Sequence, residues 1–117
     1  MSKNNDSDNT SFFGKLEFLM IGVVLLWEKD LNATERMLMG TILGLYHNSP
    51  GGCFASNAYL AQVLNLSNSR TSALLTRLKR KGYIKIEFAR DLITGKVVKR
   101  FITPLKYNDI YDEWFNE

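Results

Sequence analysis

Residues 60–84 read LAQVLNLSNSRTSALLTRLKRKGYI, and this stretch decides the fold. Its centre, Asn65-Leu66-Ser67, separates two helical patterns, because asparagine tolerates the left-handed conformation that ends many helices and serine is a good N-cap. The pattern after this turn predicts a helix from Asn68 to Lys81, closed by Gly82. At helical spacing, its expected buried stripe consists of Thr71, Leu74, Leu75 and Leu78.

Two further helices are expected before this turn. Ser56 is an N-cap for a helix over residues 57–64, whose inward side chains are Tyr59, Leu60 and Val63. Asn32-Ala33-Thr34-Glu35 resembles a capping box, and it starts a helix that runs to about Tyr46. The residues of this helix at core spacing are Met37, Leu38, Thr41, Ile42 and Leu45. Residues 47–52 then predict a turn, and Cys53-Phe54-Ala55 predicts a short extended segment.

After Gly82 the apolar period changes from 3.6 to 2, which indicates a strand. Its apolar members are Tyr83, Ile84, Ile86 and Phe88. Residues 91–96 contain Thr94-Gly95, a turn signal. The returning strand carries Val97, Val98, Phe101 and Ile102 and ends at Pro104.

The ends of the chain are less regular. Residues 1–11 are polar and aperiodic and predict a disordered tail. Residues 12–27 are apolar, and periodicity alone allows either a short strand followed by a helical turn or a continuous helix. Residues 108–117 are acidic with apolar residues at helical spacing, which favours a short helix or tail. We therefore expect one domain, residues 12–107, between two terminal segments.

The composition excludes several classes of protein. A chain of 117 residues with 45% hydrophobic residues is enough for a single core. One cysteine excludes an intramolecular disulfide framework and cannot alone supply a cysteine-rich zinc site. The longest charge-free apolar run, residues 18–27, has 10 residues, whereas a membrane-spanning helix needs about 20. With no signal-peptide pattern at the start, we expect a soluble cytoplasmic protein without membrane partners.

The net charge of +3 conceals an asymmetry along the chain. Residues 1–63 have a net charge of −2 and residues 108–117 of −4, whereas residues 64–107 carry eleven basic and two acidic side chains, a net charge of +9. A basic block inside a folded segment is typical of a surface that binds a polyanion. The alternative is a solvated positive face without a partner.

The order helix, short strand, helix, tight turn, helix and two-stranded hairpin is that of a winged helix-turn-helix, a mainly α fold with a small β-hairpin (α+β). Residues 60–67 and 74–84 resemble its pattern "LAxxLGxS…xxxLxxLxxKGhI". The segments 51–56 and 31–35 are similar to those of winged-helix domains in phage and plasmid replication initiators, replisome organisers and small DNA-binding proteins of conjugative elements. The resemblance covers residues 31 to 103.

Two departures from that pattern affect the expected site. Asn65 stands where the turn usually has glycine. Asn68, Ser69 and Ala73 stand where basic residues are frequent, so the helix is less cationic and depends on Arg70 and Arg77.

The resemblance implies that the helix over residues 68–81 enters the DNA major groove. The residues expected to face DNA are Ser67, Asn68, Ser69, Arg70, Ser72, Ala73, Thr76 and Arg77. Bidentate geometry suits Arg70 to guanine and Asn68 to adenine. Phosphate contacts are expected from Ser67 and from the cations Arg80, Lys81, Arg90, Lys96, Lys99 and Arg100. The alternatives are a phosphate contact or an internal salt bridge for Arg70 and a solvated charge for each hairpin lysine.

These features predict a sequence-specific double-stranded DNA-binding protein of a plasmid, phage or conjugative system, acting as a transcriptional regulator or origin-binding factor. Six to eight phosphate contacts imply a log–log salt slope on the order of −5 to −7. The alternative is a winged-helix module for protein interaction or oligomerisation, using residues 12–27 and 109–117. Both functions are compatible with a homodimer on two half-sites.

Other residues do not indicate catalysis. His47 has no neighbouring cysteine or second histidine and is expected on the surface. Cys53 is expected to be a small buried apolar residue, and Gly51-Gly52 lacks the residues of a phosphate-binding loop. Trp27, Trp114 and Phe115 are expected to serve packing or oligomer contacts. We therefore expect no enzymatic activity, no cofactor, no metal and no small-molecule substrate.

Overall fold

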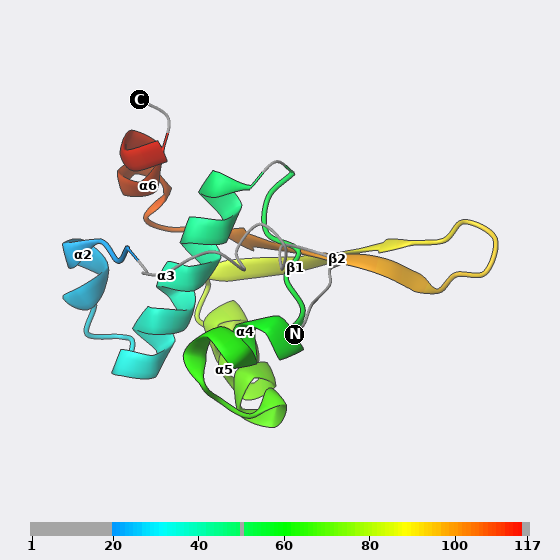
Figure 1. The fold of residues 1–117 in the computed structure, drawn as a ribbon, viewed down its shortest axis with the longest axis horizontal. Coiled ribbons are helices and arrows are strands. Elements are labelled where there is room, and N and C mark those ends of the chain that lie inside the picture. Colours follow the sequence, from blue (N-terminus) through cyan, green and yellow to red (C-terminus); the bar gives the residue numbers. More distant parts are fainter. Residues whose placement is uncertain (1–19, 50, 116–117) are drawn as a thin grey trace, which may run out of the picture.

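The computed structural model describes residues 20–49 and 51–115 of the chain. Its elements are α2 (Val23–Leu26), α3 (Ala33–Asn48), α4 (Asn57–Leu64), α5 (Asn68–Arg80), β1 (Ile84–Arg90), β2 (Val97–Pro104) and α6 (Asn108–Phe115). The helices surround α3, and the β1–β2 hairpin projects from them as a long arm (Figure 1). This mainly helical fold with an antiparallel hairpin is the predicted winged helix-turn-helix. The predicted disordered tail over residues 1–11, and the start of the ambiguous segment up to residue 19, lie outside the described residues.

Helix α3 begins as the sequence predicts and ends later. The Asn32 side chain accepts a hydrogen bond from the Glu35 N–H, and the Glu35 carboxylate accepts one from the Asn32 N–H, both at 2.8 Å. The helix continues to Asn48, so the turn predicted from His47 begins two residues too early. Met37 is 42% exposed, which contradicts its predicted place in the core. The buried residues of α3 include Leu38, Met39, Ile42, Leu43 and Leu45.

The α4–α5 connection follows the local signals closely. The Ser56 hydroxyl accepts from the Tyr59 N–H at 3.0 Å, and α4 is capped at its C-terminus by Asn65, whose φ of 57° and ψ of 50° are left-handed. The Ser67 hydroxyl then accepts from the Arg70 N–H at 3.1 Å and starts α5. Helix α5 ends one residue before the predicted end, with Lys81 as its cap. The predicted stripe is buried as expected: Thr71, Leu74, Leu75 and Leu78.

The hairpin is anchored at its base and leaves the core at its middle. Ile84 pairs with Pro104, and Ile86 pairs with Ile102, whose N–H donates to the Cys53 carbonyl at 2.8 Å. Cys53 therefore lies along the edge of β2, a pairing that was not predicted, and its side chain is buried as expected. Beyond Ile86 the side chains of β1 are mostly exposed, because the hairpin extends past the helices that cover its base. The apolar Phe88 is 53% exposed. A register shift between Ala89 and Arg90 interrupts the ladder towards the tip.

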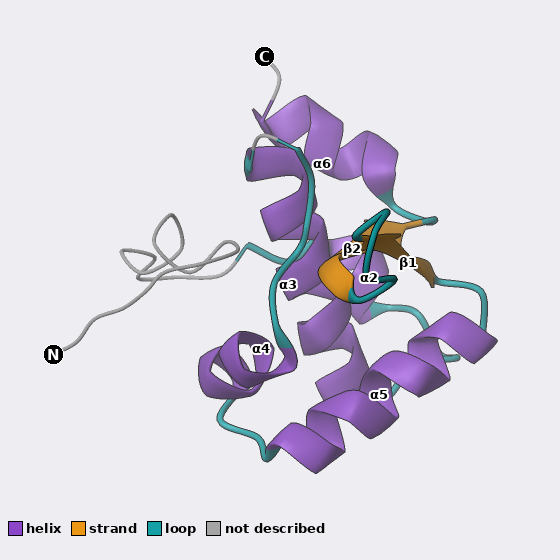
Figure 2. Ribbon diagram, turned by 90° about the vertical axis from the view of Figure 1, so that its right-hand side faces the viewer, coloured by secondary structure: helices purple, strands orange, loops and turns teal. Residues whose placement is uncertain are grey.

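Helix α6 covers the end of α3 and changes the environment of His47. The His47 ring is 7% exposed, with Nδ1 3.0 Å from the Asp112 carboxylate and Nε2 2.7 Å from the Asn108 amide oxygen. The prediction of a surface histidine is therefore wrong, because α6 packs against α3 (Figure 2). Tyr111 is fully buried, and its hydroxyl donates to the Met20 carbonyl at 2.9 Å.

Within residues 20–49 and 51–115, no helix is both long enough and apolar enough to cross a membrane.

Candidate nucleic-acid interface

The N-terminal half of α5 presents polar side chains to solvent. The residues predicted to face DNA here are all exposed, and these are Asn68, Ser69, Arg70, Ser72, Ala73 and Thr76. The Thr76 hydroxyl is directed to the Ser72 carbonyl, to which it donates at 3.0 Å. Since the apolar stripe faces inward, these side chains share the outer face of one helix.

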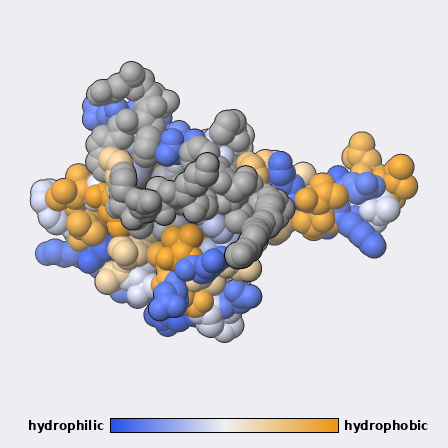
Figure 3. All heavy atoms as spheres, viewed as in Figure 1, coloured by the Kyte–Doolittle hydropathy of each residue, from blue (hydrophilic) through white to orange (hydrophobic). Residues whose placement is uncertain are grey.

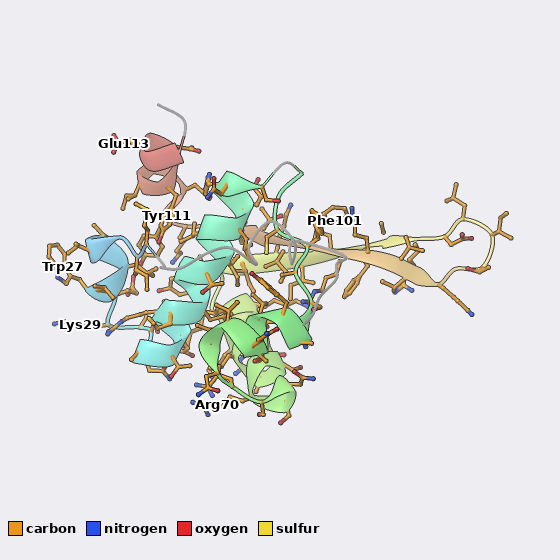
Figure 4. The ribbon with its side chains drawn as sticks, viewed as in Figure 1. Trp27, Lys29, Arg70, Phe101, Tyr111 and Glu113 are labelled. Atoms are coloured by element: carbon orange, nitrogen blue, oxygen red, sulfur yellow. The ribbon has the colours of Figure 1, made fainter. Side chains whose placement is uncertain are left out.

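Arg70 is the charged residue of this face. Figure 4 shows it on α5 at the edge of the molecule, far from Tyr111 and Glu113. Among the described residues, no carboxylate lies within ion-pair distance of it, so the internal salt bridge considered for Arg70 is absent from this part of the chain. The first turn of α5 also lacks an acidic side chain. A cation near the positive end of a helix dipole is unfavourable for the free protein, and a nearby phosphate would relieve it.

The C-terminal half of α5 is tied to α3 through a buried carboxylate. Glu35 is 1% exposed, and its carboxylate oxygens lie 3.3 Å from the Arg77 guanidinium and 3.4 Å from the Lys81 ammonium. Lys81 also donates to the Asp30 carbonyl at 2.6 Å. Two cations predicted to contact DNA are thus engaged inside the protein, and any DNA contact by them must compete with Glu35.

The charge of Glu35 is maintained by its partners. Burial opposes its ionisation, but the Asn32 N–H, Lys81 and Arg77 together outweigh this effect and lower the pKa of the carboxyl group below its usual range. The carboxylate therefore stays ionised near neutral pH, and it holds α5 against the start of α3. Its part in the capping box was predicted, but its ion pairs were not, because Arg77 and Lys81 lie 42 and 46 residues away in the sequence.

A groove lies between the first half of β2 and the segment that leads into α4. It has a volume of about 540 Å³ and is lined by residues 54–57 and 97–100. Arg100 donates to the Asn57 side chain at 2.7 Å and to the Ala55 carbonyl at 2.6 Å. This half-buried guanidinium joins the hairpin to the segment before α4, a structural role beside its predicted phosphate contact.

The remaining hairpin cations are exposed. The Lys99 ammonium lies 4.3 Å from the centre of the Phe54 ring and 5.8 Å from that of Phe101, which orients it by cation–π attraction. Arg90 donates to the Gly95 carbonyl at 3.2 Å, and Lys96 is exposed beside it. The aromatic partner Phe54 was not singled out in the sequence, because only the folded chain brings it to β2.

The described residues offer no evident metal centre. Across 20–49 and 51–115, no three side chains of histidine, cysteine, aspartate or glutamate gather closely enough to hold an ion.

Comparison with known proteins agrees with this arrangement. Residues 29–84 match the family described as "Helix-turn-helix domain", a range that runs from just before α3 to the first residue of β1. No curated protein and no solved structure matches the chain. The match supports a helix-turn-helix domain over residues 29–84 and is consistent with the observed fold, in which the β1–β2 hairpin has the place of a wing; such a domain suggests DNA binding.

Proposed function

We propose that this protein binds a specific double-stranded DNA site by placing the N-terminal half of α5 in the major groove. It would serve a plasmid, phage or conjugative element as a transcriptional regulator or origin-binding factor, the role that its sequence resemblance implies. The single observation that carries the binding mode is the open polar face of α5 around Arg70. A helix of this size fits the major groove, and a guanidinium matches the two acceptors of guanine.

The distribution of cations supports the proposal and sharpens its salt dependence. Six cations are assigned to phosphate, and six contacts give a log–log slope of about −5. Glu35 engages Lys81, and Ala55 with Asn57 engages Arg100. If these two stay with their protein partners, four contacts remain, and the slope becomes about −4.

A binding-site selection tests this function directly. The full chain is incubated at low salt with a pool of random duplexes, and bound sequences are enriched and read. We expect a short enriched motif, and tighter binding to it than to a scrambled duplex of equal composition. Lys29, exposed at the far side of the molecule from the hairpin (Figure 4), provides a control substitution that should leave both affinities unchanged. Absence of binding to any duplex at low salt would refute the proposal.

Self-association is a second candidate function, favoured by α2. This helix and its flanks expose Val23, Val24, Leu26 and Trp27, the last of them 70% exposed. We propose that two copies associate through this face, which would place two α5 helices on adjacent half-sites. Analytical ultracentrifugation of the wild type and of Trp27→Ala tests it, and a concentration-independent monomer would contradict it.

A further inference from the structure

The tip of the hairpin is apolar and unusually exposed. Leu92 is fully exposed and Ile93 is 94% exposed, while Val97 and Val98 behind them are 47% and 65% exposed. In Figure 3, hydrophobic residues mark the far end of the arm, with hydrophilic ones interspersed among them. Large aliphatic side chains that remain in water do not stabilise the fold, and an exposed apolar group of this kind often marks a site of interaction.

The backbone beneath these side chains is held in one shape. The Asp91 carboxylate accepts hydrogen bonds from the N–H groups of Ile93 and Thr94, both at 2.8 Å. The Thr94 hydroxyl accepts from the Lys96 N–H at 3.2 Å, and the Asp91 N–H donates to the Lys96 carbonyl at 2.8 Å. The loop therefore keeps its form through polar contacts, while Leu92 and Ile93 are left for an external surface.

The charges around the hairpin tip indicate which kind of partner would contact Leu92 and Ile93. Arg90 and Lys96 flank the tip, and the acidic residue between them in the sequence, Asp91, has its carboxylate turned to the loop backbone. Further down the arm, Glu87 lies 3.8 Å from Lys85 and leaves the tip cationic. An apolar point within a positive collar is complementary to a polyanion that has an apolar interior beneath its charges, as stacked base pairs have beneath their phosphates.

We propose that the hairpin tip enters the DNA minor groove beside the site of α5 and inserts Leu92 and Ile93 as a wedge at a base step, bending the duplex. This inference rests on the proposed function and adds a mode of DNA deformation to it. Apolar wedges of this kind partly unstack a step and bend DNA by roughly 20–90°. Pyrimidine–purine steps, which unstack easily, should therefore be enriched where the tip lands.

The decisive variant replaces both tip residues, L92A/I93A, because neither contributes to the core. Bending is measured by energy transfer between dyes at the ends of a duplex that carries the selected motif, and unstacking by the fluorescence of 2-aminopurine at the flanking steps. We expect the double variant to abolish both signals and to weaken binding about tenfold, with the thermal midpoint unchanged. The matched control is Leu105→Ala, an aliphatic residue just after β2 that is 49% exposed and has no proposed role in binding, which should change neither signal.

A second variant tests the shape of the loop. Asp91→Ala removes the acceptor for two N–H groups but keeps both aliphatic side chains, so we expect a smaller bend with the same motif preference.

The outcomes separate this inference from the proposed function. Binding that depends on Arg70 without any bend in the wild type would overturn the wedge and leave the major-groove assignment intact. Failure to bind any duplex would overturn both. If the double variant still bends DNA but loses binding to vesicles with anionic lipids, or loses self-association, the tip serves a membrane or a second copy and the wedge is wrong.

Discussion

Each half of α5 carries an arginine, Arg70 in the first and Arg77 in the second, and the two differ in what surrounds them. In the N-terminal half, Arg70 is exposed and has no described carboxylate in reach, whereas in the C-terminal half Arg77 lies 3.3 Å from the buried Glu35. One helix thus has an anchored end and an open end. Two arginines of one helix can therefore have different roles: the buried carboxylate of Glu35 holds Arg77 in place, whereas Arg70 stays available to a ligand.

The largest expected effect comes from removing the apolar anchor of α5. Leu78 is fully buried, so Leu78→Ala should lower the free energy of unfolding by about 2–5 kcal/mol through lost transfer energy and a residual cavity. Urea denaturation followed by circular dichroism measures this loss. The control is Ser72→Ala on the open face, which should stay within about 0.5 kcal/mol of the wild type. A similar loss in both variants would mean that the open face is also packed.

The next largest effect is expected on DNA binding, from substitution of Arg70 in the N-terminal half of α5. Arg70→Ala should cost about 1–3 kcal/mol of binding to the selected motif and relax preference at one base, because a bidentate contact is lost. Fluorescence anisotropy on selected and scrambled duplexes separates specific from general loss. Arg80→Ala, which removes an exposed cation of the same helix assigned to phosphate, should weaken binding to both duplexes about equally. If Arg70→Ala does the same, the base-reading assignment fails.

The anchored end is tested by neutralising its carboxylate. Glu35→Gln keeps an acceptor for the Asn32 N–H but removes the charge that faces Arg77 and Lys81, so we expect a loss of about 1–2 kcal/mol of stability at neutral pH. Because the folded pKa of Glu35 is lowered, its contribution is present above the ordinary glutamate pKa of about 4.3 and is lost as the pH falls through the lowered value.

Glu35→Gln should therefore differ most from the wild type near neutral pH and converge with it in acid. Unfolding free energies measured across this range check the sign. The exposed Glu87, paired with Lys85 at 3.8 Å, gives the control substitution Glu87→Gln, which should change stability by less than about 1 kcal/mol. If the unfolding free energies of Glu35→Gln and the wild type differ by the same amount at every pH, the effect of the substitution does not come from the charge of Glu35.

The smallest expected effect concerns the hairpin. Lys99→Ala should weaken binding to selected and scrambled duplexes about equally and reduce the log–log salt slope by about 1, because one phosphate contact is removed. Titrations at several salt concentrations measure the slope. An unchanged slope would mean that Lys99 serves only its contact with the Phe54 ring, 4.3 Å away.

Most of the fold could be predicted because its signals are local. The reciprocal bonds of Asn32 and Glu35, the left-handed Asn65 and the stripe from Thr71 to Leu78 each depend on neighbours within a few residues. The site was predictable in outline for the same reason, since the exposed face of α5 follows from the helical period. The predicted burial was wrong where it depends on distant segments. His47 was expected on the surface but is covered by α6, and Met37 was expected in the core but is left partly exposed by the other elements.

The amino-acid sequence by itself determined where α3 to α6 and the two strands begin and end, to within about two residues, and which face of α5 is polar, because caps, turns and periodicity act over one or two turns of chain. Only the tertiary structure decided which cations are held by partners within the protein and which remain available to an external ligand. Packing of α3 against α5 brings Glu35 to Arg77 and Lys81, and the segment before α4 engages Arg100. Electrostatic partners depend on distance in space, and residues more than 40 positions apart become neighbours only when the core forms.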